Sequence, residues 1–323
     1  MRLSTFAFLH PLAPAQLQFF RDALPDVEFV QPGETSLPER LAWAEAAAIS
    51  WNGPPIDGVL AAAPRLRWLH QRGTGIDAIS TPRLVASDLL LTNGSGNLAP
   101  NIAEHVIGLM LAFARQLPSL VRAQHERRWQ PPQVDSLFEL SGQTLALVGV
   151  GALGRAVAQR AAALGMRVQG VRLSTPEPTL PPDFSAMWSI DGIDAALRDA
   201  DHVVITLPLT AQTRKLFSTD RLAAMKRGAY LYNVGRGPVV DQDALLAALR
   251  SGQLAGAGLD VTEPEPLPAE SPLWLEPGVL ITAHSSGLTP RSFERYQALL
   301  LENMRRFDRG EALLNVVDKQ RGY

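Results

Sequence analysis

Three residues whose types suit anion binding and proton transfer each follow an apolar stretch typical of a buried strand. They are Arg236, Glu265 and His284. Arginine binds a carboxylate through a forked, permanently charged group, and histidine donates a proton near neutral pH. A carboxylate beside the histidine stabilises its imidazolium form. Reduction of a 2-keto acid needs a cation, a proton donor and a hydride, so these residues fit that reaction if a cofactor brings the hydride.

A glycine-rich segment, Gly149–Gly154, has the spacing G-x-G-x-x-G between an apolar strand and a helix rich in Ala and Val. In such a segment the first glycine makes a tight turn, the second lets the backbone approach a pyrophosphate, and the third lets the helix pack close to the strand. The helix N-terminus then offers N–H groups to the anion. The segment predicts a dinucleotide site that includes Gly149, Gly151, Ala152, Leu153 and Gly154.

The next strand end decides which dinucleotide is expected. An NAD site places an Asp or Glu about 20 residues after the glycines, where it binds the ribose 2′-hydroxyl. No acid lies between Arg167 and Pro176, and Arg172 stands where the acid is expected. Its guanidinium pairs well with a phosphate, and the hydroxyls of Ser174 and Thr175 can donate to one. The sequence therefore favours NADP(H), and NAD(H) stays open because the following loop could supply another discriminator.

The elements that must position these residues alternate between short apolar strands and helical patterns, which is typical of α/β folds with parallel sheets. We expect strands at Arg2–Leu9, Ala48–Ser50, Trp68–Gln71, Leu89–Thr92, Thr144–Val148, Arg167–Val171, His202–Leu207, Ala229–Asn233, Gly256–Leu259 and Val279–Thr282. We expect helices at Pro14–Arg21, Glu39–Ala47, Ala99–Gln116, Leu153–Leu164 and Asp241–Arg250, and a last one that begins after Thr289 and ends at Gly310. The simplest architecture is two α/β domains.

The composition excludes several classes of function. The 323 residues carry 30 Lys and Arg against 32 Asp and Glu, a net charge of −2, and no cysteine. This balance argues against nucleic-acid binding, which needs a basic surface. Without cysteine there are no disulfides, Cys-ligated zinc, iron–sulfur clusters or thiol nucleophiles, and we expect no metal site. The apolar stretches are too short for a signal peptide or a membrane span, so we expect a cytoplasmic protein that binds no membrane.

Four motifs together resemble the D-isomer-specific 2-hydroxyacid dehydrogenase family. They read LVGVGALGRAVA, YNVGRGPVVDQDALLAAL, GAGLDVTEPEPLP and ITAHSSG. The resemblance implies that Arg236 binds and polarises the substrate, that His284 donates the proton, and that Glu265 is the acid paired with it. Glu263 is a rival acid two residues away. The resemblance also implies that Asp260 meets the nicotinamide side of the cofactor.

Further binding residues and a domain division follow from the same resemblance. The loop TLPLTAQT is similar to the family loop that lines the adenosine and ribose, and the implied cofactor contacts are Leu207, Pro208, Thr213, Val234 and Gly287. The turn of Gly73, Thr74 and Gly75 is implied to bind the substrate carboxylate, with a purely structural turn as the equal alternative. Residues 1–98 and 288–323 would form a flavodoxin-like substrate domain, and residues 99–287 a Rossmann-type dinucleotide-binding domain.

With Arg172 in place of the usual acid, the sequence resembles the NADPH-preferring glyoxylate/hydroxypyruvate reductase branch of this family. We therefore expect an oxidoreductase that transfers a hydride between NADP(H) and a small 2-keto acid or D-2-hydroxy acid, as a homodimer. Trp129 is expected near the subunit contact, either reaching the partner's active site or packing at the interface. The alternatives are an NAD-linked member that uses phosphoglycerate, formate or phosphite, and a non-catalytic dinucleotide-sensing protein similar to a corepressor.

Overall fold

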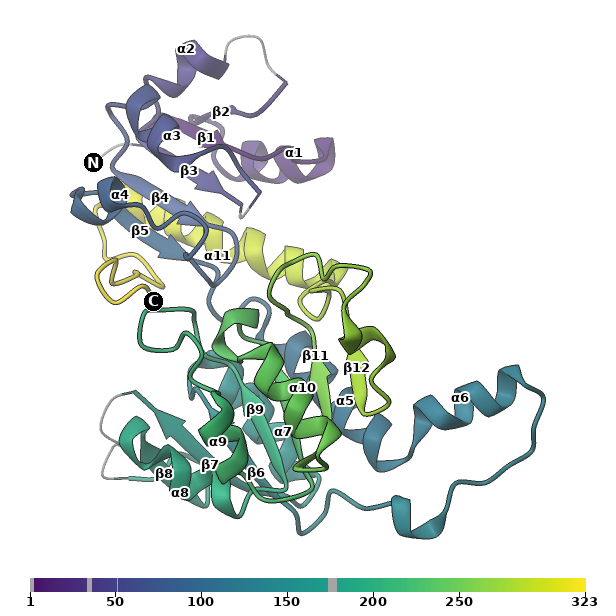
Figure 1. The fold of residues 1–323 in the computed structure, drawn as a ribbon. Helices are drawn as coiled ribbons and strands as arrows, with labels where there is room; N and C mark the ends of the chain where they lie inside the picture. Colours follow the sequence, from purple (N-terminus) through teal and green to yellow (C-terminus); the bar gives the residue numbers. More distant parts are fainter. Residues whose placement is uncertain (1–2, 34–36, 51, 174–178) are drawn as a thin grey trace. The chain divides into compact units, whose positions relative to one another are not determined.

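The computed structural model describes residues 3–33, 37–50, 52–173 and 179–323 (Figure 1). The chain divides into two compact units. Unit 1 comprises Met1–Asn97 together with Thr289–Tyr323, and unit 2 comprises Leu98–Leu288. Unit 1 is therefore built from two separate stretches of the chain.

Unit 1 contains a five-stranded parallel sheet with the order β2-β1-β3-β4-β5. The strands are β1 (Thr5–Phe8), β2 (Glu28–Val30), β3 (Ala46–Ile49), β4 (Trp68–Gln71) and β5 (Leu90–Asn93). This order is that of the flavodoxin-like doubly wound fold. Every residue of β1, β3 and β4 is buried, as expected for strands covered on both faces.

Helices cover both faces of this sheet. The helices are α1 (Pro14–Ala23), α2 (Leu37–Leu41), α3 (Ile56–Ala62), α4 (Pro82–Ala86) and α11 (Pro290–Arg309). Alternate strand residues enter two apolar clusters, one shared with α1 and α11 and the other with α3 and α4. The apolar stripe of α11, formed by Tyr296, Leu300, Met304 and Phe307, is buried in the first of these. The helix has Thr289 as its N-cap and Gly310, with φ of 71°, as its C-cap, as predicted.

The predicted helix over Glu39–Ala47 is wrong. The helical segment ends at Leu41, and Ala46 already belongs to β3, which runs between β1 and β4. Alanine has the highest intrinsic helix propensity, but the alanines of β3 are completely buried between helices on the two faces of the sheet. Tertiary packing has overridden the local preference at this position.

Unit 2 contains a seven-stranded parallel sheet with the order β12-β11-β10-β9-β6-β7-β8. The strands are β6 (Thr144–Val148), β7 (Arg167–Arg172), β8 (Ala186–Ser189), β9 (His202–Ile205), β10 (Ala229–Asn233), β11 (Leu254–Leu259) and β12 (Val279–Ile281). The chain reverses its direction of winding between β6 and β9, which is the topological switch point of a Rossmann-type sheet. The predicted fold class, two doubly wound α/β units, is confirmed.

Two layers of helices sandwich the seven-stranded sheet. α5 (Ala99–Ala114) and α7 (Ala152–Ala163) share one apolar cluster with it, and α8 (Ile193–Arg198), α9 (Thr219–Ala224) and α10 (Gln242–Arg250) share another. Asp241, the first residue of the helix predicted over Asp241–Arg250, is the N-cap of α10. Short 3₁₀ turns occur at Val134–Ser136, Ile190–Gly192, Gly237–Val239 and Pro272–Leu275.

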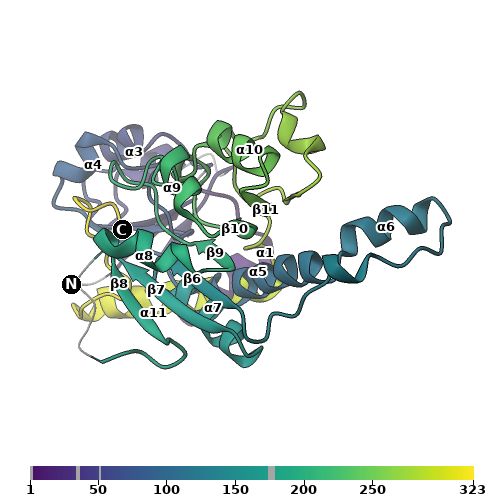
Figure 2. The same ribbon diagram turned by 60° about the horizontal axis from the view of Figure 1, so that its bottom comes forward.

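Helix α6 (Leu117–His125) follows α5 after a bend of 68° and extends away from the sheet of unit 2 (Figure 2). Within the described residues no single helix is both long enough and apolar enough to cross a membrane. The bent pair of α5 and α6 reaches the required length and composition only when the two helices are taken together. Half of the α5 residues are buried in unit 2.

Candidate active site

The predicted chemistry gathers at one edge of the seven-stranded sheet. Val148 lies beside Ile205, Ile205 beside Asn233, Asn233 beside Leu259, and Leu259 beside Ile281. Five parallel strands therefore end in register, and the polar segments that follow them emerge along one carboxyl edge. In open α/β sheets this edge holds the ligand crevice, next to the switch point.

The glycine segment has the geometry that a dinucleotide requires. Gly149 has φ of 111°, a left-handed conformation that favours glycine, and its carbonyl oxygen accepts a hydrogen bond of 2.8 Å from Thr206 Oγ1. A Cβ on Gly154 would lie 2.1 Å from the Gly149 oxygen, so only glycine fits there. Gly151 is the exposed N-cap of α7, and a Cβ on it would meet nothing within 4 Å. Exposed Ala152 and half-buried Leu153 begin the helix, so these residues fit a pyrophosphate at its N-terminus.

The loop after β9 lies against the glycine segment. Thr213 is buried, and its Oγ1 donates to the Pro208 carbonyl oxygen at 2.7 Å. Leu207 is also buried, and its carbonyl oxygen would lie 2.6 Å from a Cβ on Gly235. This close approach brings the turn that begins at Val234 beside the Leu207–Thr213 loop. The structure thus groups these predicted cofactor residues along the carboxyl edge.

Arg172 is the last residue of β7 and is half-buried. The amide of Gly149 donates to the carbonyl oxygen of Val171 at 3.0 Å, so Arg172 stands one residue from a direct contact with the glycine segment. The other two predicted phosphate ligands, Ser174 and Thr175, lie outside the described residues.

The predicted acid and histidine are in contact. His284 Nδ1 lies 2.8 Å from Glu265 Oε2, and the other oxygen of this carboxylate accepts from the amide of Thr262 at 3.0 Å. The His284 side chain is 54% exposed, so the imidazole is held on one side and open to a ligand on the other. The rival acid Glu263 instead pairs with Arg214 at 2.9 Å. The geometry therefore selects Glu265 as the partner of the histidine.

Arg236 lies in the neighbouring turn after β10. Its backbone carbonyl oxygen accepts from Asn233 Nδ2, and its guanidinium Nη1 donates to the Gly235 carbonyl oxygen, both at 2.9 Å. The backbone of Gly237 is so close to Thr262 that a Cβ would lie 1.9 Å from the Thr262 oxygen. Because Thr262 also donates to Glu265, the Arg236 turn and the Glu265 turn form one packed structure.

Asp260 and Gly287 lie below the surface of this site. Asp260 is 2% exposed, and its carboxylate accepts hydrogen bonds from the segment that carries His284. Gly287 is buried against Leu98, with a Cβ position 3.2 Å from a Leu98 methyl carbon. Asp260 is therefore buried beneath the segment that carries His284, and its carboxylate is hydrogen-bonded to other residues of the protein.

The predicted substrate turn, Gly73–Gly75, lies at the carboxyl end of β4 in unit 1. Its three carbonyl oxygens accept, in order, from the Gly94 amide, from Asn93 Nδ2 and from Gln71 Nε2. The turn is therefore tied to its own sheet through its carbonyl groups. The hydrogen bonds within unit 1 support a structural role for the Gly73–Gly75 turn. Binding of the substrate carboxylate by this turn stays a prediction.

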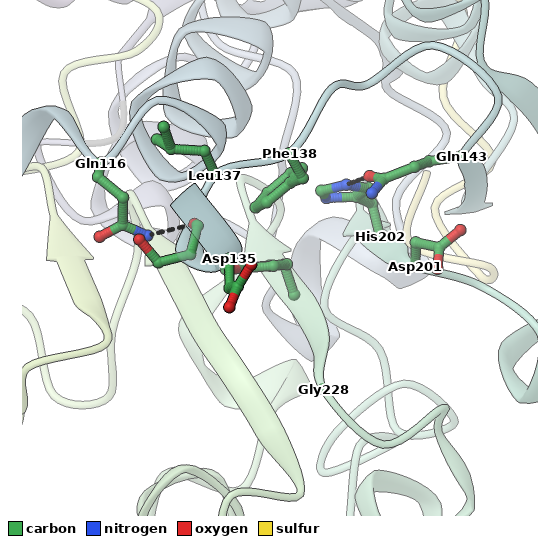
Figure 3. A pocket seen from close by; sticks show the side chains of 10 residues that line it. Gln116, Asp135, Leu137, Phe138, Gln143, Asp201, His202 and Gly228 are labelled. Carbon is green, nitrogen blue, oxygen red and sulfur yellow. Dashed lines mark hydrogen bonds between the residues drawn. The ribbon is translucent and has the colours of Figure 1, made fainter. Parts of the chain in front are cut away.

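A cavity of about 320 Å³ lies at the opposite, amino edge of the seven-stranded sheet (Figure 3). It is lined by the segment Asp135–Phe138 together with Gln116, Gln143, Asp201, His202, Gly228 and Tyr230. His202 is completely buried and contacts Gln143 and the Tyr232 hydroxyl. Its burial lowers the pKa of the imidazole to about 4. The sequence did not predict this cavity, and none of the predicted site residues lines it.

Three residues that contact the candidate site were missed by the sequence analysis. Thr282 and Ser286 flank His284 and donate hydroxyl hydrogen bonds to Asp260, and His105 on α5 reaches Thr282. Thr282 and Ser286 stand within the ITAHSSG motif, two residues from His284 on either side. Their closeness to the histidine in the sequence could have identified them as site residues. His105 is 177 positions away from Thr282, so its spacing carried no signal.

Comparisons with known proteins identify the class that this fold and site define. The family model described as D-isomer specific 2-hydroxyacid dehydrogenase, NAD binding domain, matches residues 107–286. A glyoxylate reductase of Korarchaeum cryptofilum is 32% identical over 312 residues, which are 94% of this chain and 90% of that protein. A D-3-phosphoglycerate dehydrogenase of Mycobacterium tuberculosis is 30% identical over 322 residues, which are 98% of this chain and 59% of that one.

Among solved structures, an NADPH-dependent glyoxylate/hydroxypyruvate reductase of Sinorhizobium meliloti in complex with NADP and sulfate is similar, with a TM-score of 0.86. It is 27% identical, and the match covers 99% of this chain and 100% of that one. The chain belongs to the D-isomer-specific 2-hydroxyacid dehydrogenase family. It is an NAD(P)-dependent 2-hydroxyacid dehydrogenase, and the predicted resemblance and enzyme class are confirmed.

Proposed function

We propose that the protein reduces a small 2-keto acid, such as glyoxylate or hydroxypyruvate, to its D-2-hydroxy acid with NADPH. One observation carries this proposal: the half-exposed His284 is bonded to Glu265 on one side and open on the other, at the carboxyl edge of a Rossmann-type sheet. This is the arrangement of a proton donor that a carboxylate holds in place. Relatives named as glyoxylate reductases support the choice of substrate.

The mechanism assigns a separate task to each side chain. The nicotinamide, when bound, supplies a hydride to the keto carbon. Arg236 binds the substrate carboxylate and draws electron density from the carbonyl group. His284 Nε2 donates a proton to the carbonyl oxygen as the alcohol forms. Glu265 holds the ring through Nδ1 and stabilises its positive charge, so that the proton sits on the nitrogen that faces the substrate.

Other residues of unit 2 would bind the cofactor. The α7 N-terminus with Gly149, Gly151 and Gly154 would hold the pyrophosphate, because Gly151 leaves open space at the N-cap of α7 and the first amides of the helix are available to an anion there. The loop Leu207–Thr213 would line the adenosine side. Arg172 at the end of β7 would hold the 2′-phosphate, which supports NADP(H) over NAD(H). The NADP complex of the similar Sinorhizobium meliloti enzyme is consistent with that preference.

The direct test is NADPH oxidation with a panel of 2-keto acids that includes glyoxylate, hydroxypyruvate, pyruvate and 3-phosphohydroxypyruvate. His284→Ala should lower kcat by about a hundredfold or more and leave the dissociation constant of NADPH within about twofold, since the lost group transfers a proton. His125→Ala, which removes an exposed histidine of α6, is the matched control. If His284→Ala reduces glyoxylate as fast as the wild type does, the assignment of His284 as the proton donor is wrong.

The cofactor preference has its own test. Arg172→Asp should lower kcat/KM for NADPH by about tenfold or more and raise the ratio of NADH to NADPH efficiency, because a carboxylate repels a phosphate and accepts from a ribose hydroxyl. Arg155→Asp, a charge reversal at an exposed position of α7, is the control for a general electrostatic effect. An unchanged NADH-to-NADPH ratio in Arg172→Asp rejects the phosphate role.

The alternatives give different results in the same assays. An NAD-linked relative would prefer NADH in the wild type and would turn over 3-phosphohydroxypyruvate, or oxidise formate or phosphite. A dinucleotide-sensing protein would bind NADPH and turn over none of these compounds. Binding measured by calorimetry together with the substrate panel therefore separates the proposals.

We also propose that the enzyme is a homodimer that uses the α6 arm. Leu117 and Val121 of α6 are about half exposed, Val134 is 80% exposed, and Trp129 is fully exposed. These residues belong to a segment that projects from unit 2 (Figure 2), and exposed apolar patches are typical of an interface. Light scattering coupled to size exclusion should give a dimer for the wild type and a monomer for a Trp129→Ser/Val121→Ser double variant. A wild-type monomer at assay concentration contradicts this proposal.

A further inference from the structure

The backbone that carries His284 needs support from outside its own turn. His284 has φ of 49°, a left-handed conformation. This conformation is unfavourable in free energy for any residue that has a Cβ. Its amide donates to the carbonyl oxygens of Asp260 and Thr282 at 2.9 and 3.0 Å. Its side chain is half exposed, so the imidazole itself contributes little packing to fix the turn. The strain must be balanced by the residues on either side.

The buried carboxylate of Asp260 collects the donors of this turn. Oδ1 accepts from Thr282 Oγ1 at 2.6 Å and from the Ser285 amide at 3.0 Å. Oδ2 accepts from the Ser286 amide at 3.2 Å and from the Ser286 hydroxyl. Charge-assisted hydrogen bonds of this kind are roughly twice as strong as neutral ones. Asp260 therefore holds the turn on both sides of His284.

Helix α5 also contacts this turn. Asn101 Nδ2 donates to the Ser286 carbonyl oxygen at 2.8 Å, and His105 Nε2 lies 3.1 Å from Thr282 Oγ1. The two α5 residues are four positions apart, so they share one helix face. α5 is itself packed in the core of unit 2, which makes it a rigid support. One helix face thus meets both ends of the segment that carries His284.

The direction of the His105 hydrogen bond follows from counting protons. The Thr282 hydroxyl has one proton, which it gives to Asp260, because an ionised carboxylate only accepts. Its oxygen must therefore accept from His105, so His105 Nε2 carries a proton. The same nitrogen lies 4.0 Å from Asp260 Oδ1. His105 thus donates to Thr282, and Thr282 donates to Asp260. The two hydrogen bonds connect the turn to α5 and to the end of β11.

We propose that His105 is a positioning residue for His284: through Thr282 and the Asp260 carboxylate, and together with Asn101, it fixes the turn that presents the imidazole to the substrate. The proposal rests on the proposed function in so far as His284 is the proton donor. Glu265 fixes the orientation of the ring, whereas the α5 contacts fix the backbone beneath it. Displacement of a catalytic group by about 1 Å can cost about a hundredfold in rate, so the backbone contacts matter to turnover.

The test uses variants that differ in one donor. His105→Leu removes the Nε2 donor and keeps an apolar side chain, and His105→Gln returns an N–H donor at a similar reach. With NADPH and glyoxylate, His105→Leu should lower kcat by about ten- to a hundredfold and change the dissociation constant of NADPH by less than about twofold. His105→Gln should recover kcat to within about threefold of the wild type. Glu104→Gln, an exposed neighbour on α5 that pairs with Arg160, is the control.

A second measurement needs no turnover. Hydrogen exchange of the Ser285 and Ser286 amides reports their bonds to Asp260, and these amides should exchange at least about tenfold faster in His105→Leu and in Asn101→Ala than in the wild type. If His105→Leu fails to fold, Asn101→Ala carries the test. If the wild type reduces no 2-keto acid, the proposed function fails and exchange alone decides the positioning role.

The results of these experiments either support or overturn the positioning role of His105. Loss of kcat with recovery in His105→Gln and faster exchange of the two amides supports the proposal. An unchanged kcat in His105→Leu overturns it. A fall of kcat in His105→Leu and His105→Gln alike, with the exchange of these amides unchanged, also overturns it, because the role of the residue is then packing of α5 alone.

Discussion

The stability of the fold should fall steeply in mild acid, because histidines are buried in their neutral form. Burial lowers the pKa of His202 from 6.5 to about 4. Between these values the unfolded chain binds a proton that the folded chain does not bind. The folded state therefore has its full stability above about pH 6.5 and loses it as the pH falls towards about 4.

The magnitude follows from the size of the shift. At about pH 5 the unfolded imidazole is protonated and the folded one is not, which costs about 2 kcal/mol for one histidine at 1.36 kcal/mol per pH unit. In unit 1, burial lowers the pKa of His10 to about 4 and that of His70 to about 3. These two histidines should therefore cost unit 1 about 4 kcal/mol at about pH 5, a large part of the 5–15 kcal/mol that is typical of a folded domain.

The assay is the free energy of unfolding in urea at about pH 7.5 and about pH 5, with His202→Gln beside the wild type. The variant is less stable at the higher pH, because it loses contacts to Gln143 and Tyr232, but it should lose about 2 kcal/mol less than the wild type between the two pH values. Tyr232→Phe removes the hydroxyl next to His202 and keeps the imidazole, so it should keep the pH dependence of the wild type. Equal losses in His202→Gln and the wild type would refute the reasoning.

Three further predictions concern single contacts. Gly154→Ala should abolish NADPH binding in a calorimetric titration, because its Cβ would lie 2.1 Å from the Gly149 oxygen and displace the glycine segment; binding within about twofold of the wild type would contradict this. Glu265→Gln should lower kcat for glyoxylate by about tenfold or more, whereas Glu263→Gln should change it by less than about twofold, since only Glu265 contacts the histidine. Asp241→Ala should lower the free energy of unfolding by about 1 kcal/mol through loss of the α10 N-cap, measured by urea denaturation.

The elements with the clearest local signals could be predicted closely from the sequence. The predicted bounds of β4, β6 and β10 agree with the structure, and α11 begins after Thr289 and ends at Gly310 as predicted. β4 and β6 are buried along their whole length, and α11 has a Thr289 N-cap followed by proline and a glycine C-cap, so local and tertiary preferences agree in these elements. The helix predicted over Glu39–Ala47 failed because alanine-rich composition does not distinguish a helix from a strand buried on both faces.

Some residues of the candidate site could likewise be predicted from the sequence, and others could not. The glycines, Arg236, Glu265 and His284 stand in short motifs whose spacing is informative, and the structure brings Glu265 and His284 together. The contact of His105 with Thr282 joins α5 to the turn after β12, which no local pattern encodes. The burial of Asp260 was likewise invisible, because the residue type alone suggests a solvated or ligand-facing carboxylate.

Unit 1 has a consequence for the order in which the enzyme is made. Its sheet comes from the first part of the chain, but α11 covers one face of that sheet from the far end, and the Leu3 amide donates to Asp308 across 305 positions. The whole of unit 2, residues 98–288, is translated in between. At roughly 5–20 residues per second this interval lasts about 10–40 s. A ribosome-bound chain can thus complete unit 2 while an apolar face of unit 1 still awaits its last helix, and that face is where a chaperone would bind.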